Sequence, residues 1–166
     1  MARNTEAKLL RAERSLVVRP ERGDMRIVVA FPNRYWVAMS NLGFQTVYAL
    51  FAEQPRSCVE RAFVEPKSGP DAVVRTFESR SALSSADILA ISVACETDYL
   101  NVLRLCASSG RSLGRSRQQP EHARNAGPLI LGGGAALTIN PEPVAEFFDA
   151  ILIGEADEAI SEIAQI

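Results

Sequence analysis

Short runs of apolar residues alternate along the chain with longer segments in which apolar positions recur at helical spacing. Each run is long enough for a buried strand and too short for a helix, and β-branched residues are frequent in it. The pattern predicts strands over residues 26–32, 59–64, 87–94, 129–131 and 150–153, with a short edge strand over 73–77. It predicts helices over 7–15, 42–53, 98–108, 141–148 and 155–166, and loops over 33–41 and 110–125.

This alternation predicts an α/β domain with a right-handed, mostly parallel, doubly wound sheet of about five strands. In such a sheet, ligands bind in the crevice at the carboxyl ends of the strands. The segments that follow the strands, residues 32–40, 92–97, 132–138 and 154–157, should therefore converge there although they are far apart in the sequence.

Three consecutive glycines end one of the predicted strands, in the sequence LILGGGAA at 129–136. Because they lack side chains, Gly132, Gly133 and Gly134 allow the backbone to lie against a large planar ligand or a phosphate. The next helix is expected only near Pro141, so a phosphate at a helix N-terminus would sit some distance from these glycines. A later apolar run, ILIGEADE at 151–158, also reaches a glycine before a helical pattern.

The composition is that of a soluble globular protein: of 166 residues, 47% are hydrophobic and 23% are charged. Residues 1–24 are expected to form an N-terminal arm, since Pro20, Gly23 and Asp24 interrupt the chain, and residues 25–166 to form one domain. The net charge of -2 predicts no general attraction to nucleic acid or to an anionic membrane. No apolar run is long enough for a membrane span or resembles a signal-peptide core, which favours a cytoplasmic location.

The residue types that carry catalysis do not form a recognisable constellation. His122 is the only histidine, and it lies in a polar loop where a surface position is expected. No G-x-G-x-x-G follows the first strand, and there is no Walker loop. Three widely spaced cysteines are expected to be buried thiols rather than metal ligands: Cys58, Cys95 and Cys106. Carboxylates near the expected crevice would suit a carboxylate enzyme or a magnesium site, but their spacing is unspecific: Glu96, Glu155, Asp157 and Glu158. The chain is therefore typical of a binding module.

Six short motifs together resemble a known family. They are FPNRYWVAMSNLG at 31–43, FESR at 77–80, ISVACET at 91–97, GGG at 132–134, NPEP at 140–143 and FDAILIGE at 148–155. In combination they resemble the N-terminal cobalamin-binding-type domain of an uncharacterised branch of radical S-adenosylmethionine (radical SAM) proteins, over about residues 25–165. The resemblance implies a Rossmann-like, flavodoxin-like cobalamin-binding fold.

The wider cobalamin-binding fold uses three stations, and the resemblance places each of them on this chain. The station D-x-H-x-x-G, whose histidine ligates cobalt, falls on residues 33–38, the station S-x-L on 92–94, and a glycine pair on 132–133. Met39 and Leu42, with Tyr35, are expected to face the corrin, and Ser92 and the glycines the nucleotide tail. The cofactor-binding set implied in this way is Asn33, Tyr35, Met39, Ser40, Leu42, Gly43, Ser92, Ala94, Glu96, Gly132, Gly133, Gly134 and Gly154.

The first station departs from the family's pattern, since Asn33 replaces the aspartate, Tyr35 the histidine and Ala38 the glycine. A phenol with a pKa of about 10 is a poor cobalt ligand at neutral pH, so any bound cobalamin should lack a histidine bond on its lower face. The chain also lacks the C-x-x-x-C-x-x-C sequence whose thiolates hold an iron–sulfur cluster. The cluster and S-adenosylmethionine are therefore expected only in a partner catalytic domain, in cis or in trans.

Two functions follow from the resemblance. The first is a cobalamin-binding accessory domain of a radical SAM enzyme that is not catalytic alone, and the intact Gly132 to Gly134 run favours it. The second is a domain that keeps the fold without the cofactor and serves as a protein-interaction or substrate-docking module. The substitutions at Asn33, Tyr35 and Ala38 favour this second function.

Overall fold

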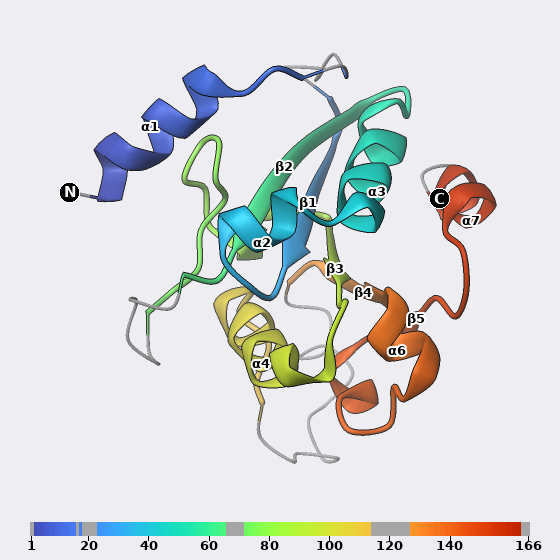
Figure 1. Cartoon of the computed structure of the whole chain (residues 1–166). Helices are drawn as coiled ribbons and strands as arrows, with labels where there is room; N and C mark the ends of the chain where they lie inside the picture. The colour runs from blue at the N-terminus through green and yellow to red at the C-terminus, as the bar shows by residue number, and fades with distance from the viewer. Residues whose placement is uncertain (1, 16, 18–22, 66–71, 114–126, 164–166) are drawn as a thin grey trace.

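The computed structural model describes residues 2–15, 17, 23–65, 72–113 and 127–163. In this part of the chain a five-stranded sheet has the order β2-β1-β3-β4-β5, and every pair of neighbouring strands is parallel. The strands are β1 (Met25–Phe31), β2 (Ser57–Phe63), β3 (Ile88–Ser92), β4 (Leu129–Gly133) and β5 (Ala150–Ile151). The predicted α/β class with a parallel sheet of about five strands is confirmed (Figure 1).

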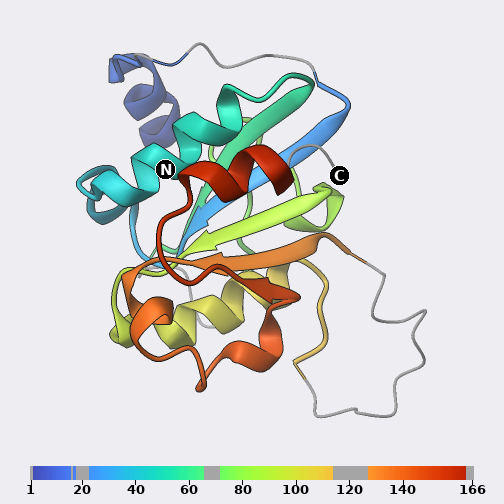
Figure 2. The same ribbon diagram turned by 90° about the vertical axis from the view of Figure 1, so that its right-hand side faces the viewer.

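The sheet is buried on both faces, which explains why its strands are continuous apolar runs rather than alternating ones. In β1, Ile27, Val29 and Phe31 point to one face, and Val28 and Ala30 to the other. Helices cover both faces (Figure 2). We call them the α3 face and the α4 face, after the helix that packs on each.

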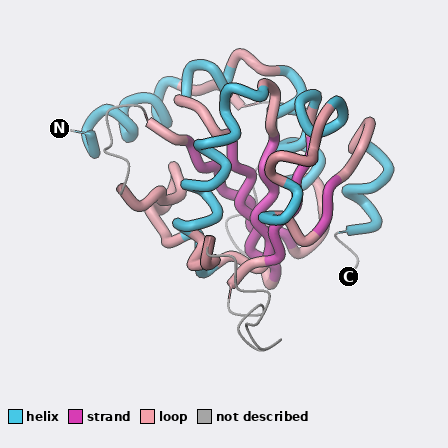
Figure 3. Tube along the Cα trace, turned by 90° about the horizontal axis from the view of Figure 1, so that it is seen from below, coloured by secondary structure: helices cyan, strands magenta, loops and turns pink. Residues whose placement is uncertain are grey.

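The α3 face carries α2 (Tyr35–Met39), α3 (Leu42–Ala52) and α7 (Asp157–Ile163). The α4 face carries α4 (Tyr99–Ser108) and α6 (Ala135–Ile139). The chain also forms three short 3-10 turns, which are η1 (Leu83–Ser85), η2 (Glu96–Asp98) and η3 (Ala145–Phe147). Seen from below, the strands lie in the middle of the molecule with helices on either side (Figure 3). The helices predicted over 42–53, 98–108 and 155–166 are thus present within a few residues of the expected bounds.

Two expectations about the strand-to-helix connections are wrong. Residues 33–41 contain helix α2 instead of only a loop, because Tyr35 and Ala38 lie one helical turn apart and both are buried. The helix expected over 141–148 is only the turn η3, since Pro141 and Pro143 leave two backbone positions without N–H donors. Helix α6 instead begins directly after Gly134, so the glycine run does lead straight into a helix.

The buried sides of two helices also differ from those expected. Leu42 and Leu100 are 78% and 77% exposed, whereas Phe44 in α3 and Val102 and Cys106 in α4 are buried. The expected edge strand over 73–77 is reduced to isolated bridges, of Thr76 with Ala62 and of Arg75 with Ala82. Of the three cysteines, only Cys106 is buried; Cys58 is half-buried and Cys95 is exposed, which corrects the expectation for those two.

The N-terminal arm contains α1 (Ala2–Ala12) and contacts the α3 face. Leu9 and Leu10 pack against that core, and Glu6 forms an ion pair with Arg80 at 2.8 Å. The helix begins and ends a few residues before the bounds expected from the sequence. His122 and most of the predicted polar loop lie outside the described residues.

Candidate functional site

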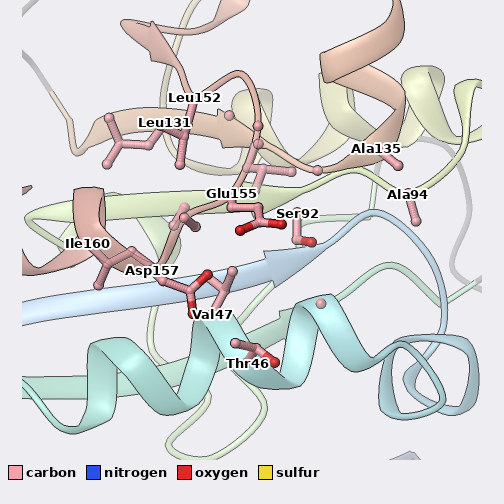
Figure 4. Close-up of a pocket in the computed structure, with 18 of the residues that line it drawn as sticks. Thr46, Val47, Ser92, Ala94, Leu131, Ala135, Leu152, Glu155, Asp157 and Ile160 are labelled. Atoms are coloured by element: carbon pink, nitrogen blue, oxygen red, sulfur yellow. The ribbon is translucent and has the colours of Figure 1, made fainter.

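A cavity of about 520 Å³ lies on the α3 face, between α3 and α7 and over the carboxyl ends of β3 and β4 (Figure 4). Its walls come from four stretches of the chain, within residues 41–51, 90–94, 131–135 and 152–163. The volume falls in the range of roughly 300–1,000 Å³ that is usual for small-molecule pockets. The cavity thus lies at the edge of the sheet where the sequence predicts ligand binding, and three of the four predicted segments line it.

Small residues on two neighbouring strands form the floor of the cavity. Ser92 at the end of β3 is paired in register with Gly133 at the end of β4, and Ala90 is paired with Leu131 one step below. All four residues line the cavity, because side chains two positions apart on a strand point to the same face. The space exists because Ala90, Ser92 and Gly133 fill little of the gap between α3 and α7.

The three glycines of the run have different roles. A Cβ at Gly132 would lie 2.8 Å from the Phe148 ring, so this glycine is required by packing on the α4 face. Gly134 has a φ of +106°, and a Cβ there would lie 2.6 Å from the carbonyl oxygen of Val93. At Gly133 the nearest atoms to a Cβ belong to Leu152, at 3.9 and 4.0 Å, and φ is not positive. Only Gly133 is therefore free of a structural requirement for glycine.

The structure brings eight of the thirteen predicted residues to the cavity and leaves five outside it. Those that line it are Leu42, Gly43, Ser92, Ala94, Gly132, Gly133, Gly134 and Gly154. Those that do not are Asn33, Tyr35, Met39, Ser40 and Glu96. Except for Glu96, the residues outside come from the connection after β1, where the resemblance to cobalamin-binding domains predicts the first station.

Tyr35 is buried beside the N-terminal arm, away from the cavity. Its ring stacks on Phe77 with a centroid distance of 5.0 Å and contacts Phe63 edge-on at 5.5 Å. Its hydroxyl donates to Glu13 Oε1 at 2.6 Å. Burial raises the pKa of Tyr35 to about 12, and the hydrogen bond to Glu13 and its negative charge act in the same direction. The phenol is therefore neutral at physiological pH and is already engaged within the protein.

Arg61 links the same arm to the sheet. Its Nη2 pairs with Glu13 Oε2 at 2.8 Å and its Nε with Glu78 Oε1 at 2.7 Å, while its Nη1 donates to the Met39 sulfur at 3.4 Å. Met39 is thereby directed into this cluster rather than into the cavity.

Asn33 and Ser40 also have structural partners. The Asn33 side chain donates to Asp98 Oδ1 at 2.8 Å, and the Ser40 hydroxyl donates to the Trp36 carbonyl at 2.8 Å. Burial raises the pKa of Asp98, and the hydrogen bond from Asn33 opposes the rise. Asn33 thus connects the end of β1 to the start of α4.

Several residues that line the cavity were missed by sequence reasoning. The two-residue alternation of strands could have indicated Ala90 from Ser92 and Leu131 from Gly133. The helical contributors, Thr46, Val47 and Phe51 from α3 and Ile160 from α7, depend on how the two helices pack together. No signal within one helix could have identified that arrangement.

Within the described residues, no three side chains of histidine, cysteine, aspartate or glutamate are grouped so as to hold a metal ion. None of the helices in this part of the chain has both the length and the apolar composition needed to cross a membrane.

The model of the family described as radical SAM proteins, N-terminal, matches residues 43–166. The matched residues include every strand of the sheet except β1. They also include all the residues that line the cavity except Asn41 and Leu42. No curated protein matches the chain. The match covers well over half of the chain, so the protein belongs to the family of N-terminal domains of radical SAM proteins.

Proposed function

We propose that this chain is a cobalamin-binding accessory domain of a radical SAM protein and that it performs no catalysis alone. The observation that carries the proposal is the pairing of Ser92 with Gly133 at the floor of the cavity. By the resemblance, these residues fall on the second and third stations of the cobalamin-binding pattern, and they lie side by side on adjacent strands. The iron–sulfur cluster and S-adenosylmethionine belong to a catalytic partner domain in this account.

The cavity suits one end of cobalamin. Small residues form its floor, and its walls are mostly apolar. This shape suits the flat benzimidazole base of the nucleotide tail. The apolar wall residues include Val47, Phe51, Leu131 and Ile160. The corrin is too large to enter beside the base, so it would lie outside, over the carboxyl edge. The residues that line the cavity within the described chain include no histidine, so none of them would supply a histidine ligand to cobalt.

When bound, cobalamin would supply a cobalt centre for methyl transfer or another radical step with the partner domain. The chain's own contribution is to bind and orient it. Gly133 would allow the ligand to approach the backbone closely, and the Ser92 hydroxyl would provide a hydrogen-bonding group. The apolar walls would exclude water from the base.

Titration with hydroxocobalamin, followed by visible absorbance, tests the proposal with Gly133→Val. Because the side-chain position at Gly133 opens on the cavity, its branched side chain should occupy ligand space while leaving the fold intact. We expect saturable binding to the parent and an affinity at least tenfold lower for the variant. Ala107→Val, at an exposed position of α4 on the opposite face, is the control and should bind like the parent. A parent that binds no cobalamin, or equal binding by Gly133→Val, would refute the proposal.

A second function, that of a docking module without cofactor, is favoured by a different observation. Exposed large apolar side chains occur in the segments that follow β1, β3, β4 and β5: Trp36, Val37, Leu42, Leu100, Ile139 and Ile153. These segments share the carboxyl edge of the sheet, and such a concentration is typical of a protein contact. If this is the whole function, Leu42→Ser and Ile153→Ser should weaken binding of the catalytic domain while the parent fails to bind hydroxocobalamin.

A further inference from the structure

The cavity carries charge of only one sign. Among the described residues that line it, the only ionisable side chains are Glu155 and Asp157, and no lysine, arginine or histidine is present. Both carboxylates are exposed at the rim formed by the connection between β5 and α7 and by the first residue of α7. An anion entering here would meet two like charges and no cation to pair with.

Asn41 lines the cavity and its side chain accepts from the Phe44 N–H, but the other four polar side chains there have no such partner among the described residues. Figure 4 shows the Glu155 and Asp157 side chains over the same space as the Ser92 and Thr46 hydroxyls. None of the four forms a side-chain hydrogen bond or ion pair with another described residue. Two of them are carboxylates, which accept hydrogen bonds and do not donate them when ionised. The other two are hydroxyls, which can do either.

From these two features we infer that the cavity selects ligands by charge: it favours a neutral or cationic ligand that joins an apolar ring to a group with hydrogen-bond donors, and it disfavours a phosphate. A phosphate moved from water into this space would lose hydration without gaining an opposite charge, which is unfavourable. The charge selection follows from the cavity itself, and only its application to cobalamin rests on the proposed function. There, the base and its ribose would enter, and the phosphodiester would stay outside the rim.

The apolar walls of the cavity would hold the ring of the ligand. The carboxylates and hydroxyls at the cavity would accept hydrogen bonds from the donor groups of the ligand. The ribose hydroxyls of a nucleoside can donate to Glu155 or Asp157, whereas a phosphate at the same ribose brings its negative charge toward them. Both carboxylates face solvent, so their repulsion is partly screened and should weaken further as salt is added. The expected discrimination is therefore moderate and dependent on ionic strength.

The test compares α-ribazole, the uncharged benzimidazole nucleoside of the cobalamin tail, with its 5′-phosphate. Equilibrium binding to the parent chain should favour the nucleoside at least tenfold at low salt. The double variant Glu155→Gln with Asp157→Asn should reduce this preference to less than threefold. Glu158→Gln in the first turn of α7 does not line the cavity and should leave the preference unchanged. Melting temperatures confirm that each variant is folded.

The outcomes separate this inference from the proposed function. If the nucleoside is preferred and hydroxocobalamin does not bind, the charge selection stands and the assignment of cobalamin fails. If hydroxocobalamin binds but nucleoside and nucleotide bind equally, the charge selection is overturned alone. Tighter binding of the phosphate, no saturable binding of either compound, or an unchanged preference in the double variant would also overturn it.

Discussion

Single alanine substitutions along the glycine run should have three different effects, although the three residues are consecutive. At Gly132 the new methyl would lie 2.8 Å from two carbons of the Phe148 ring and 2.9 Å from Leu137 Cδ1. Both neighbours are buried side chains of the α4-face core, at 8% and 0% exposure, so they have little freedom to move. The substitution therefore overpacks a filled core.

Overpacking of this kind costs about 1–3 kcal/mol of unfolding free energy. In a chain of this size, such a loss corresponds to a fall in melting temperature of about 2–12 °C. Gly134→Ala should cost at least as much, because a positive φ adds about 1–2 kcal/mol for a residue with a Cβ and the obstructing atom is the backbone carbonyl of Val93. Gly133→Ala meets only ordinary contacts with Leu152, so its stability should stay within about 1 kcal/mol of the parent.

Differential scanning calorimetry and urea denaturation of the parent and the three variants provide the measurement. The expected order of stability is the parent with Gly133→Ala, then Gly132→Ala, then Gly134→Ala. Equal stability of the parent and Gly132→Ala would show that Phe148 is not packed as described. A loss at Gly133 as large as that at Gly132 would show that Gly133 has a structural role after all, and that it is not the free position at the cavity floor.

Two further predictions concern the cluster that joins the arm to the sheet. Arg61→Met should lower the unfolding free energy by about 3–5 kcal/mol, because it removes the guanidinium that pairs with the Glu78 carboxylate, whose side chain is only 3% exposed. Arg56→Met removes an ion pair whose side chains are both 75% exposed and should change stability by less than about 1 kcal/mol, so similar losses in the two variants would contradict the assignment. Because the pKa of Tyr35 in the folded protein is raised to about 12 from 10.0, folding favours the protonated phenol, and that stabilising contribution is complete below pH 10 and lost as pH rises through 12. The stability difference between the parent and Tyr35→Phe, from urea denaturation at several pH values, should therefore shrink over this range, whereas a constant difference would show that Tyr35 does not titrate with a raised pKa.

The sheet and the edge at which the cavity lies could be predicted because both depend on local patterns. A parallel sheet buried on both faces requires uninterrupted apolar strands such as 87–94, and these stand out in the sequence. The carboxyl edge then follows from topology, and it brought Ser92 and Gly133 together as expected.

What could not be predicted depends on contacts between distant parts of the chain. Tyr35 turns away from the cavity because its hydroxyl donates a hydrogen bond to Glu13, which lies in the N-terminal arm. Leu42 is exposed while Phe44 is buried, because packing against β1 and β2 decides which side of α3 faces inward. The early start of α6 depends on the positive φ of Gly134, which a run of three glycines allows but does not assign to one of them.

We propose that this domain holds its ligand in the carboxyl-edge cavity between α3 and α7. Hydrogen–deuterium exchange with and without hydroxocobalamin tests it most directly, because it locates the protected backbone. We predict slower exchange in peptides that cover 92–94, 133–135 and 154–157 and the start of α3, with no change over α4. Protection confined to the arm or to the α4 face, with those segments unchanged at saturating cobalamin, would contradict the account.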